Sequence, residues 1–474
     1  MSSFGGLNTA LSGLLAHRRA IDAIGNNIAN VNTPGFTRRT VTLKPSVGAI
    51  VPSRFNLNSD GNSYGVEVGS IDRVRDAFLD AKARTEMGNK ASTAGAARVL
   101  GNIEALFPEP SDTGLGSQLA DLWNAFDTAA NNPADTAQRS IVLVQAQGVA
   151  ARFAKSATDL ADVHDNLANE AAATVVDINT TADQIAKLNS QIRLAVTGGA
   201  EWSALADQRD ALVDKLTGLT GATVRDGEFG QVNVVVGNIG LVTGEKAEHL
   251  VLDSSAPLPP PYTGMPFTQT TLRWERGGYA VADFGGSLSA TLTGLNDTVP
   301  RYLAQLNGLA ASVVNSVNTL HRTGQGGDPV NDVNLDFFDP AGVTAQTMAL
   351  STQVDGQPNR IALGAVGSGG LDGSVGHQLG AIANSSTGPD AAYRSMLANL
   401  GIETDAANQR ATMQAQVATD AASQRAAVSG VNLDEEMTNL VLSQHAYEAS
   451  ARLMTSIDEM LDTLINRTGL VGRA

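Results

Sequence analysis

The sequence predicts a mainly α protein with a β-rich insertion, in which terminal heptad helices forming a coiled coil flank a central long-helix bundle and a small β-domain. Apolar residues recur at alternating four- and three-residue steps near both ends of the chain. Aromatic residues make up only 4% of the 474 residues, so Ala and aliphatic side chains must fill the interiors, which favours helix-on-helix packing. Period-2 alternation, which is typical of strands, is concentrated within residues 222–290.

The first predicted helix runs from Leu7 to Val31. It must end near Asn30, because Pro34 disfavours the helical conformation at the residue before it. Pro34 and Gly35 then provide the two central residues of a type II turn, and an extended stretch follows over residues 37–51. The apolar seam of this helix consists of Leu7, Leu11, Leu14, Ile21 and Ile28.

The last predicted helix runs from Leu433 to Ile465 and repeats the same rhythm. Asn432 is its predicted N-cap, and Glu435 stands three residues later, as in a capping box. Its apolar seam consists of Leu433, Met437, Leu440, Tyr447, Ala451, Met454, Leu461 and Ile465.

These two terminal helices cannot bury a narrow apolar stripe alone. Either they pair with each other, or with copies of themselves, as a coiled coil, or they pack on the central domain as ordinary surface helices. The heptad pattern by itself leaves both interpretations open.

Further helices and a few strands are predicted between the two ends. Val232, Val234 and Val236 alternate along one strand, and residues 271–281 indicate a hairpin around Gly277 and Gly278. Aliphatic residues at helical spacing, separated by Gly, Pro and Asn breaks, predict helices over residues 112–131, 136–169, 178–192, 202–219 and 303–320.

These elements divide the chain into five predicted segments. They are an N-terminal axial helix with the extended segment after it (1–50), the first part of a helical bundle (51–221), a β-rich outer domain (222–290), the second part of the bundle with an irregular Gly-rich segment at 324–388 (291–428), and a C-terminal axial coiled-coil helix (429–474).

Composition and charge exclude several classes of function. The 32 basic and 48 acidic residues give a net charge of −16, whereas binding to nucleic acid requires a basic surface. The absence of Cys excludes disulfides, thiolate metal sites and cysteine nucleophiles. No apolar run reaches the roughly 18–20 residues of a membrane span. The first residues also lack the pattern of a cleaved signal peptide. We therefore expect no nucleic-acid partner and no membrane insertion.

No catalytic constellation is found. The six histidines are scattered, and no two have the spacing of metal ligands on one helix. Residues 332–343 begin like a calcium loop, but Phe337 stands where the loop requires Gly. Arg209, between Asp207 and Asp210, indicates a structural ion pair where two helices meet. We predict a protein that is not an enzyme and holds no cofactor or metal.

Two terminal motifs resemble the signatures shared by bacterial flagellar rod, hook and hook-associated proteins. The C-terminal one covers residues 429–436, followed by Gln444 and Tyr447. The N-terminal one comprises Asn26, Asn27, Asn30, Asn32, Thr33, Pro34, Gly35 and Phe36.

The middle of the chain resembles the family of hook-associated protein 1, the first hook–filament junction protein. The core motif of this resemblance is Asp207, Gln208, Arg209 and Asp210. The other stretches that carry it are residues 132–139, 185–189, 318–321 and 337–338.

The resemblance implies a structural adaptor that is exported unfolded by the flagellar type III system and forms a ring of copies at the hook tip. The terminal helices would line the channel, the bundle would surround them and the β-domain would lie outside. The implied partners are the hook protein, the second hook–filament junction protein, copies of the chain itself, the type III export apparatus and an export chaperone on the C-terminal helix. The implied location is the hook–filament junction, extracellular after export.

Two alternatives stay open at this point. A hook or distal rod protein would share the terminal motifs but should lack the long helical centre and the 207–210 motif. A type III-secreted surface or adhesion protein could be built on a similar coiled coil.

Overall fold

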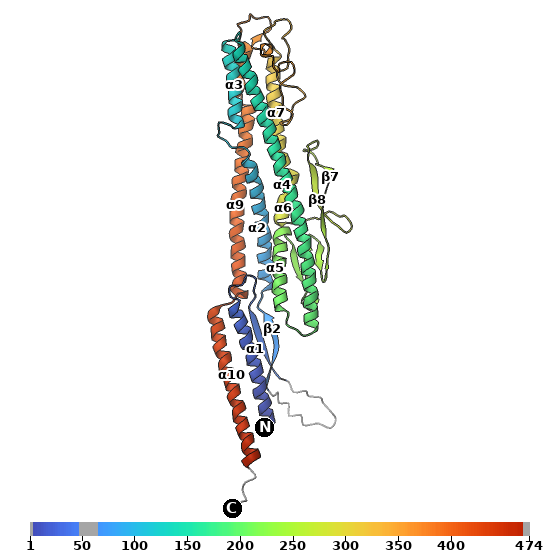
Figure 1. Ribbon diagram of the computed structural model, residues 1–474, viewed down its shortest axis with the longest axis vertical. Helices are drawn as coiled ribbons and strands as arrows, with labels where there is room; N and C mark the ends of the chain where they lie inside the picture. Colours follow the sequence, from blue (N-terminus) through green and yellow to red (C-terminus); the bar gives the residue numbers. More distant parts are fainter. Residues whose placement is uncertain (1–2, 47–64, 468–474) are drawn as a thin grey trace, which may run out of the picture.

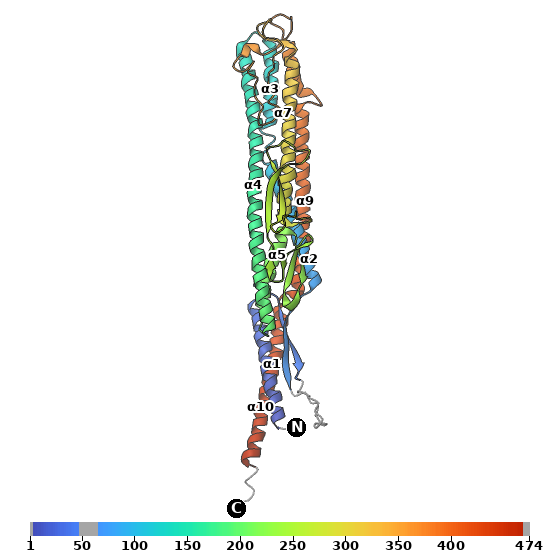
Figure 2. The ribbon, with the colours of Figure 1, turned by 90° about the vertical axis from the view of Figure 1, so that its right-hand side faces the viewer.

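The computed structural model describes residues 3–46 and 65–467 and shows an elongated, mainly helical molecule (Figure 1). Both ends of the chain lie at the same end of the molecule, where α1 (Ser3–Ala29) and α10 (Leu433–Asp462) lie side by side (Figures 1 and 2). Strands β1 (Arg39–Pro45) and β2 (Val66–Arg73) form an antiparallel hairpin that packs on α1. We call these four elements the axial unit.

The ends of the axial helices follow the sequence predictions closely. The Thr33 carbonyl accepts a hydrogen bond from the Phe36 N–H (3.2 Å), and Gly35 has a φ of 79°, as a type II turn requires. The Asn432 side chain caps α10 by accepting from the Asp434 and Glu435 N–H groups. The Glu435 carboxylate does not complete the predicted capping box, because it pairs with Arg38 instead (2.6 Å).

The bundle above the axial unit consists mainly of long helices. The longest, α4, has 62 residues and joins the two predicted helices over 136–169 and 178–192, because the Ala- and Val-rich segment between them continues the helical pattern. The helices of the bundle are α2 (Ala77–Glu104), α3 (Leu115–Asn131), α4 (Thr136–Thr197), α5 (Ser203–Thr220), α6 (Gly286–Thr293), α7 (Val299–His321), α8 (Ser374–Gly380) and α9 (Pro389–Ser429), with a π-helical turn (Gly294–Thr298) between α6 and α7.

Helices α2 and α9 pack against each other along the bundle. The sequence pattern predicts neither helix individually, because both are rich in Ala and carry no continuous stripe of large apolar residues. Their contact depends on tertiary packing more than on periodicity.

Two small sheets lie beside α4, within residues 222–290 (Figure 2). The predicted strand of alternating valines is β4, and the predicted hairpin is present, but its return strand is reduced to a single bridge between Arg273 and Ala280. One sheet contains β3 (Thr223–Asp226), β4 (Val232–Val236), β5 (Ile239–Thr243) and β6 (Lys246–Ala247), and the other pairs β7 (Leu250–Pro257) with β8 (Thr268–Trp274).

The segment at 324–388 is mostly irregular, and contains the short helix α8 and one short pair of strands, β9 (Gly324–Gln325) and β10 (Gly364–Ala365). It covers the far end of the bundle (Figure 1). Phe337 and Phe338 from this segment are fully buried beside Phe126 of α3 and join the core of the bundle.

The predicted boundary between residues 50 and 51 lies outside the described residues, as does the end of the predicted extended stretch at 47–51. The paired strands β1 and β2 stand on either side of that boundary. A division of the chain near residue 75, where β2 leads into α2, therefore fits the strand pairing better.

Candidate functional site

Helices α1 and α10 run antiparallel and meet along a line of small residues. A Cβ added at Gly6 would lie 3.0 Å from Ile457, and one added at Gly13 would lie 2.8 Å from Ser450. Further along the same line, Asn27 of α1 contacts Glu436 of α10. The small side chains let the two backbones approach closely, which large side chains at these positions would prevent.

The predicted apolar seam is not this line of contact. On each helix the contact line lies one residue before the predicted heptad seam, so none of the predicted seam residues is fully buried. Five of them are exposed, namely Leu11, Leu433, Met437, Tyr447 and Ile465. The others are half-buried, namely Leu7, Leu14, Ile21, Ile28, Leu440, Ala451, Met454 and Leu461.

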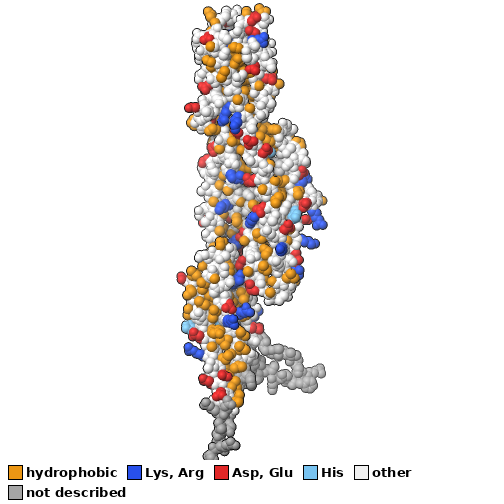
Figure 3. Space-filling view, in the orientation of Figure 1, with side chains coloured by type: hydrophobic (Ala, Val, Ile, Leu, Met, Phe, Trp, Pro, Cys, Tyr) orange, Lys and Arg blue, Asp and Glu red, His pale blue; other side chains and the backbone are white. Residues whose placement is uncertain are grey.

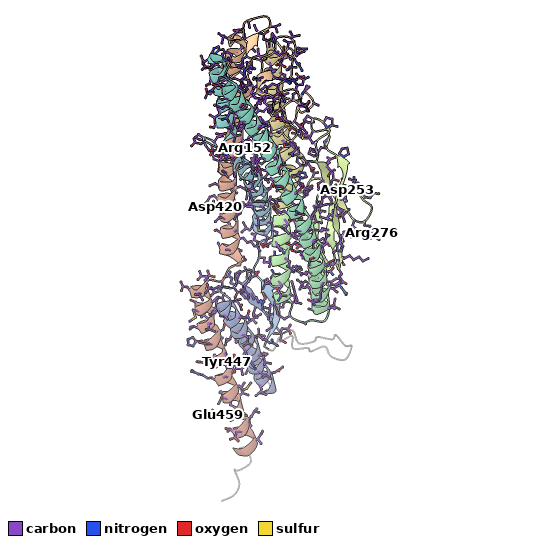
Figure 4. All side chains as sticks on the ribbon, turned by 45° about the horizontal axis from the view of Figure 1, so that its top comes forward. Arg152, Asp253, Arg276, Asp420, Tyr447 and Glu459 are labelled. Carbon is purple, nitrogen blue, oxygen red and sulfur yellow. The ribbon has the colours of Figure 1, made fainter. Side chains whose placement is uncertain are left out.

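Hydrophobic side chains consequently gather on the outside of the axial unit (Figure 3). They include Met437, which is 50% exposed, and Leu442, which is 62% exposed. Tyr447 and the acidic Glu459 lie on the same helix, α10 (Figure 4). We call the exposed members of this set the outer stripe, and they are Leu11, Leu15, Leu433, Met437, Val441, Leu442, Tyr447, Leu453, Met460, Leu464 and Ile465.

Within the N-terminal motif, Asn27 connects three elements. Its buried amide nitrogen donates to Glu436 Oε2 on α10 and to the Arg39 carbonyl on β1, each at 2.9 Å. Its amide oxygen accepts from the Arg39 N–H at 3.0 Å. Glu436 is itself buried, so Asn27 satisfies a charge that would otherwise lack a donor.

The other residues of the motif form the helix end and the turn. The Asn30 amide donates to the Asn26 carbonyl, and the Thr33 hydroxyl donates to Asn30. The turn lies against α5, because a Cβ added at Gly35 would be 4.0 Å from that of Ala211. Asn32 and Pro34 are exposed, and the half-buried Phe36 lies beneath the guanidinium of Arg39 (5.3 Å).

The 207–210 motif faces this turn and the hairpin. Arg39 of β1 reaches Asp207 at 3.5 Å, and Arg73 of β2 reaches it at 3.0 Å. Arg73 also contacts Asp210, and so does Arg75, at 2.7 Å. Asp207 and Asp210 are three residues apart on α5, which places both carboxylates on one face of the helix. The motif and the N-terminal turn are therefore brought together by the fold.

Charge and burial act in opposite directions at Asp210. Burial alone would raise its pKa, but Arg209, Arg73 and Arg75 outweigh burial and hold the pKa at about 2. Arg209 points toward the β-rich domain, where it donates to the Gly230 carbonyl (2.6 Å) while contacting Asp210 (3.1 Å). Gln208 is exposed.

We call this set of contacts the joint, because it lies between the axial unit and the bundle. Sequence reasoning finds Asn27, Asp207 and Asp210 but misses Glu436 and the three arginines as members of one site. The signal available was the cluster of arginines where the first strand of the hairpin begins and the second one ends. Their partners in the joint lie more than 130 residues away in the sequence, so no local pattern reveals them. The joint consists of Arg39, Arg73, Arg75, Asp207 and Asp210, and Asn27 with Glu436 holds Arg39 from within the axial unit.

The remaining motifs from the middle of the chain place buried polar side chains between helices and irregular segments. Asn189 of α4 donates to the Val232 and Gly244 carbonyls, both at 2.7 Å. Asn318 of α7 accepts from the Phe337 and Phe338 N–H groups. Asn189 therefore attaches the β-rich domain to α4, and Asn318 attaches the segment at 324–388 to α7.

Within residues 3–46 and 65–467, no group of three or more His, Asp or Glu side chains is arranged so that it could hold a metal ion. In the same residues, no helix combines the length and apolarity that crossing a bilayer requires. What the joint and the outer stripe can do is hold two parts of a chain together and offer apolar surface to other proteins.

Comparison with known families first defines the class. Residues 7–37 match the flagellar basal body rod protein family, and residues 422–467 match the C-terminal family of the rod proteins FlgEFG. These matches cover the two axial helices and their motifs, so the ends of the chain are those of a flagellar axial protein. Only residues 422–429, the last turns of α9, extend either match into the bundle.

The match to the bundle identifies the family. Residues 100–338, half of the chain, match the helical domain of the flagellar hook-associated protein FlgK. The chain belongs to the family of flagellar hook-associated protein 1, FlgK. This family is structural, so the chain is a structural component of the bacterial flagellum and not an enzyme.

Relatives from Bacillus subtilis and Escherichia coli are among those that carry the name flagellar hook-associated protein 1. That of Bacillus subtilis is 29% identical over 508 aligned positions, which cover both chains completely. That of Escherichia coli is 28% identical over 341 positions, which cover 70% of this chain and 59% of the relative.

The fold is also that of a solved relative. The flagellar hook junction protein FlgK from Burkholderia pseudomallei superposes with a TM-score of 0.62 over 75% of this chain and all of that one, at 14% identity. The predicted mainly helical class with a few small sheets is therefore confirmed.

Proposed function

We propose that this chain is the adaptor subunit that joins the hook to the filament, assembling as a ring of copies at the hook tip. The observation that carries the proposal is the outer stripe, in which five of the predicted heptad positions and further apolar side chains of α1 and α10 are exposed in the single chain. A patch of this kind marks a surface that other proteins cover. In a chain of this family, the partners are copies of itself, the hook protein and the second junction protein.

The elongated shape supports the same assignment. The axial unit lies at one end and the bundle extends from it (Figure 1), so copies packed through their axial units would surround a central channel. The predicted heptad seam then belongs to contacts between copies, where α1 and α10 would form the inner coiled-coil layer. The β-rich domain, which lies on the side of the bundle, would face outward.

Export by the flagellar type III system is part of the proposal. A chain with no Cys forms no disulfide that would oppose unfolding before passage through a narrow channel. After export the protein would be extracellular, at the hook–filament junction.

A hook or distal rod protein remains the alternative role within the class. The rod-type matches at residues 7–37 and 422–467 fit it, but they include no more of the bundle than the last turns of α9. A type III-secreted adhesion protein would explain neither terminal match.

Deletion of the gene in the source bacterium tests the role. We expect hooks without filaments by electron microscopy, and flagellin monomers in the medium by immunoblot. Absent hooks would instead place the protein in the rod or hook. Normal filaments would show that the proposed role is wrong, unless a paralogue encoded in the same genome compensates for the deleted gene.

A chaperone that binds α10 before export is the second part of the proposal that can be tested directly. Alanines at Leu440, Tyr447, Met454 and Leu461 should weaken binding of the export chaperone, because these residues form one apolar line of the helix. The matched control places alanines at Thr438, His445, Arg452 and Glu459, which are exposed on the same helix with the same spacing. Equal affinity of the two variants would contradict the proposal.

A further inference from the structure

The axial unit and the bundle are connected by only two short segments, residues 74–76 and 430–432. Apart from these, no described helix or strand of the axial unit makes an extensive contact with one of the bundle. At the second connection, the Arg38 N–H donates to the Ser429 carbonyl (2.9 Å). The charged contacts of the joint are therefore the main noncovalent tie between the two parts.

These contacts resist rotation because they are shared. Asp207 receives arginines from both strands of the hairpin, and Asp210 receives Arg73 and Arg75. Rotating the hairpin about residues 74–76 would break at least two of these ion pairs. Buried ion pairs add little net stability, but they specify one geometry, and arginine forks constrain direction as well as distance.

We infer that the ion pairs of Arg39, Arg73 and Arg75 with Asp207 and Asp210 fix the direction of the axial unit relative to the bundle. Asp207 and Asp210 are positioning residues, and the 207–210 motif is the part of the bundle that sets this direction. The inference concerns the single chain and goes beyond the proposed role in the ring, so it can fail while that role stands.

A distance measurement on the full-length chain tests the inference. The sequence contains no Cys, so a spin-labelled pair at Gln191→Cys on α4 and Ala449→Cys on α10 reports only the two chosen sites, both of which are exposed. Double electron–electron resonance then gives the distribution of distances across the joint.

The variant to compare is Arg73→Gln/Arg75→Gln. Every carboxylate that loses an arginine keeps another, because Asp207 keeps Arg39 and Asp210 keeps Arg209. Asp80, which also binds Arg75, keeps Arg425 in the same way. The bundle should therefore stay folded, with an unchanged circular dichroism spectrum.

The matched control, Arg84→Gln/Arg301→Gln, removes two arginines whose pairs lie inside the bundle. Arg84 pairs with Asp214 of α5, and Arg301 pairs with Glu403 of α9. We expect a narrow distance distribution in the parent and the control, and a distribution broadened or shifted by several ångströms in the joint variant.

Three results would overturn the inference. They are a broad distribution already in the parent chain, an unchanged narrow distribution in the joint variant, and equal broadening in the control. Should the double variant lose helical signal, Arg39→Gln alone provides the decision, because Arg39 lies on the hairpin and, among residues 3–46 and 65–467, Asp207 is the carboxylate to which it donates a hydrogen bond. Broadening in the folded Arg39→Gln variant supports the inference, and no broadening overturns it.

Discussion

Helices of the bundle bury their largest side chains, whereas the two axial helices meet through some of their smallest. Trp123, Phe126 and Phe153 of α3 and α4 are almost completely inaccessible. In the axial unit the contact line includes Gly6 and Gly13, and apart from Ile24 and Ile457 the described large apolar side chains of the two helices are half-buried or exposed. The same chain thus contains one region whose apolar surface is buried within the chain and one region whose apolar surface is not.

This difference indicates that the bundle provides most of the stability of the single chain, and that the axial helices provide the surface for association with other chains. Burial of large apolar side chains provides most of the favourable free energy of folding. We therefore expect substitutions in the bundle to lower stability of the single chain, and substitutions in the outer stripe to affect contacts with partners. The following predictions test that separation.

The largest effect is expected for Phe126→Ala in the core of the bundle. Phe126 is fully buried against Phe337, at a ring-centroid distance of 5.2 Å. Truncation of a buried Phe leaves a cavity and should lower the free energy of unfolding by about 3–5 kcal/mol. The control Phe78→Ala removes the same side chain where it is 73% exposed on α2, and should change stability by less than about 0.5 kcal/mol. Similar losses in urea unfolding would contradict the comparison.

Acid should destabilise the far end of the bundle through His321. Its Nδ1–H donates to the Leu335 carbonyl (2.7 Å), and its Nε2 accepts from the Ala362 N–H (2.9 Å), so only the neutral ring fits. Burial lowers the pKa of His321 to about 4, below its ordinary value near 6.5. The unfolded chain therefore binds the proton more readily, and stability is lost as the pH falls from 6.5 toward 4.

Because one pKa unit corresponds to about 1.4 kcal/mol, this single histidine should account for about 3 kcal/mol between pH 6.5 and pH 4. Urea unfolding at several pH values measures how much of the free energy of unfolding is lost between pH 6.5 and pH 4. His321→Gln should reduce this loss by about 3 kcal/mol. The protection factor of the Ala362 amide, which corrects for the slower intrinsic exchange in acid, should fall before those of amides in the middle of α4. An identical loss in parent and variant would show that folding does not change the pKa of His321.

The two regions also differ in how far the sequence predicts them. Helix ends and turns depend on neighbouring residues, so Asn432, Pro34 and Gly35 reveal them directly. The joint depends on arginines and aspartates that are distant in sequence, and a list of charges does not show which of them meet. The predicted seam at Leu7 and Met437 follows the larger side chains, whereas the single chain packs along small ones. Periodicity identifies an apolar face but not the molecule that will cover it.

An intermediate effect is expected for Gly13→Leu on the axial contact line. A Cβ at this position would lie 2.8 Å from Ser450 Oγ and 3.5 Å from Ser450 Cβ, so rotation of the hydroxyl makes room for a methyl group but not for the larger side chain of Leu, which should push α1 and α10 apart. Overpacking of this kind costs about 1–3 kcal/mol. The control Gly25→Leu has nothing within 4 Å and should leave the contact intact. Hydrogen exchange of α10 should accelerate in the first variant only, and equal exchange would show that the helices do not meet along this line.

The smallest effect on the single chain is expected for Met437→Ala in the outer stripe. Met437 is 50% exposed, so its truncation should change stability by less than about 0.5 kcal/mol. The matched variant Ile457→Ala removes a side chain on the contact line that is only 5% exposed. It should therefore accelerate hydrogen exchange of α10, which Met437→Ala should not.

For filament assembly, in contrast to stability, we expect the outer stripe to have the largest effect. If copies cover Met437, its replacement combined with Leu433→Ala and Leu442→Ala removes apolar area that is exposed in the single chain and buried in the ring. We expect a chain of unchanged stability that fails to restore filaments in the deletion strain, although it is secreted at parental levels. Restored filaments would show that the stripe contributes nothing to assembly, and lost secretion would move its role from the ring to the export step.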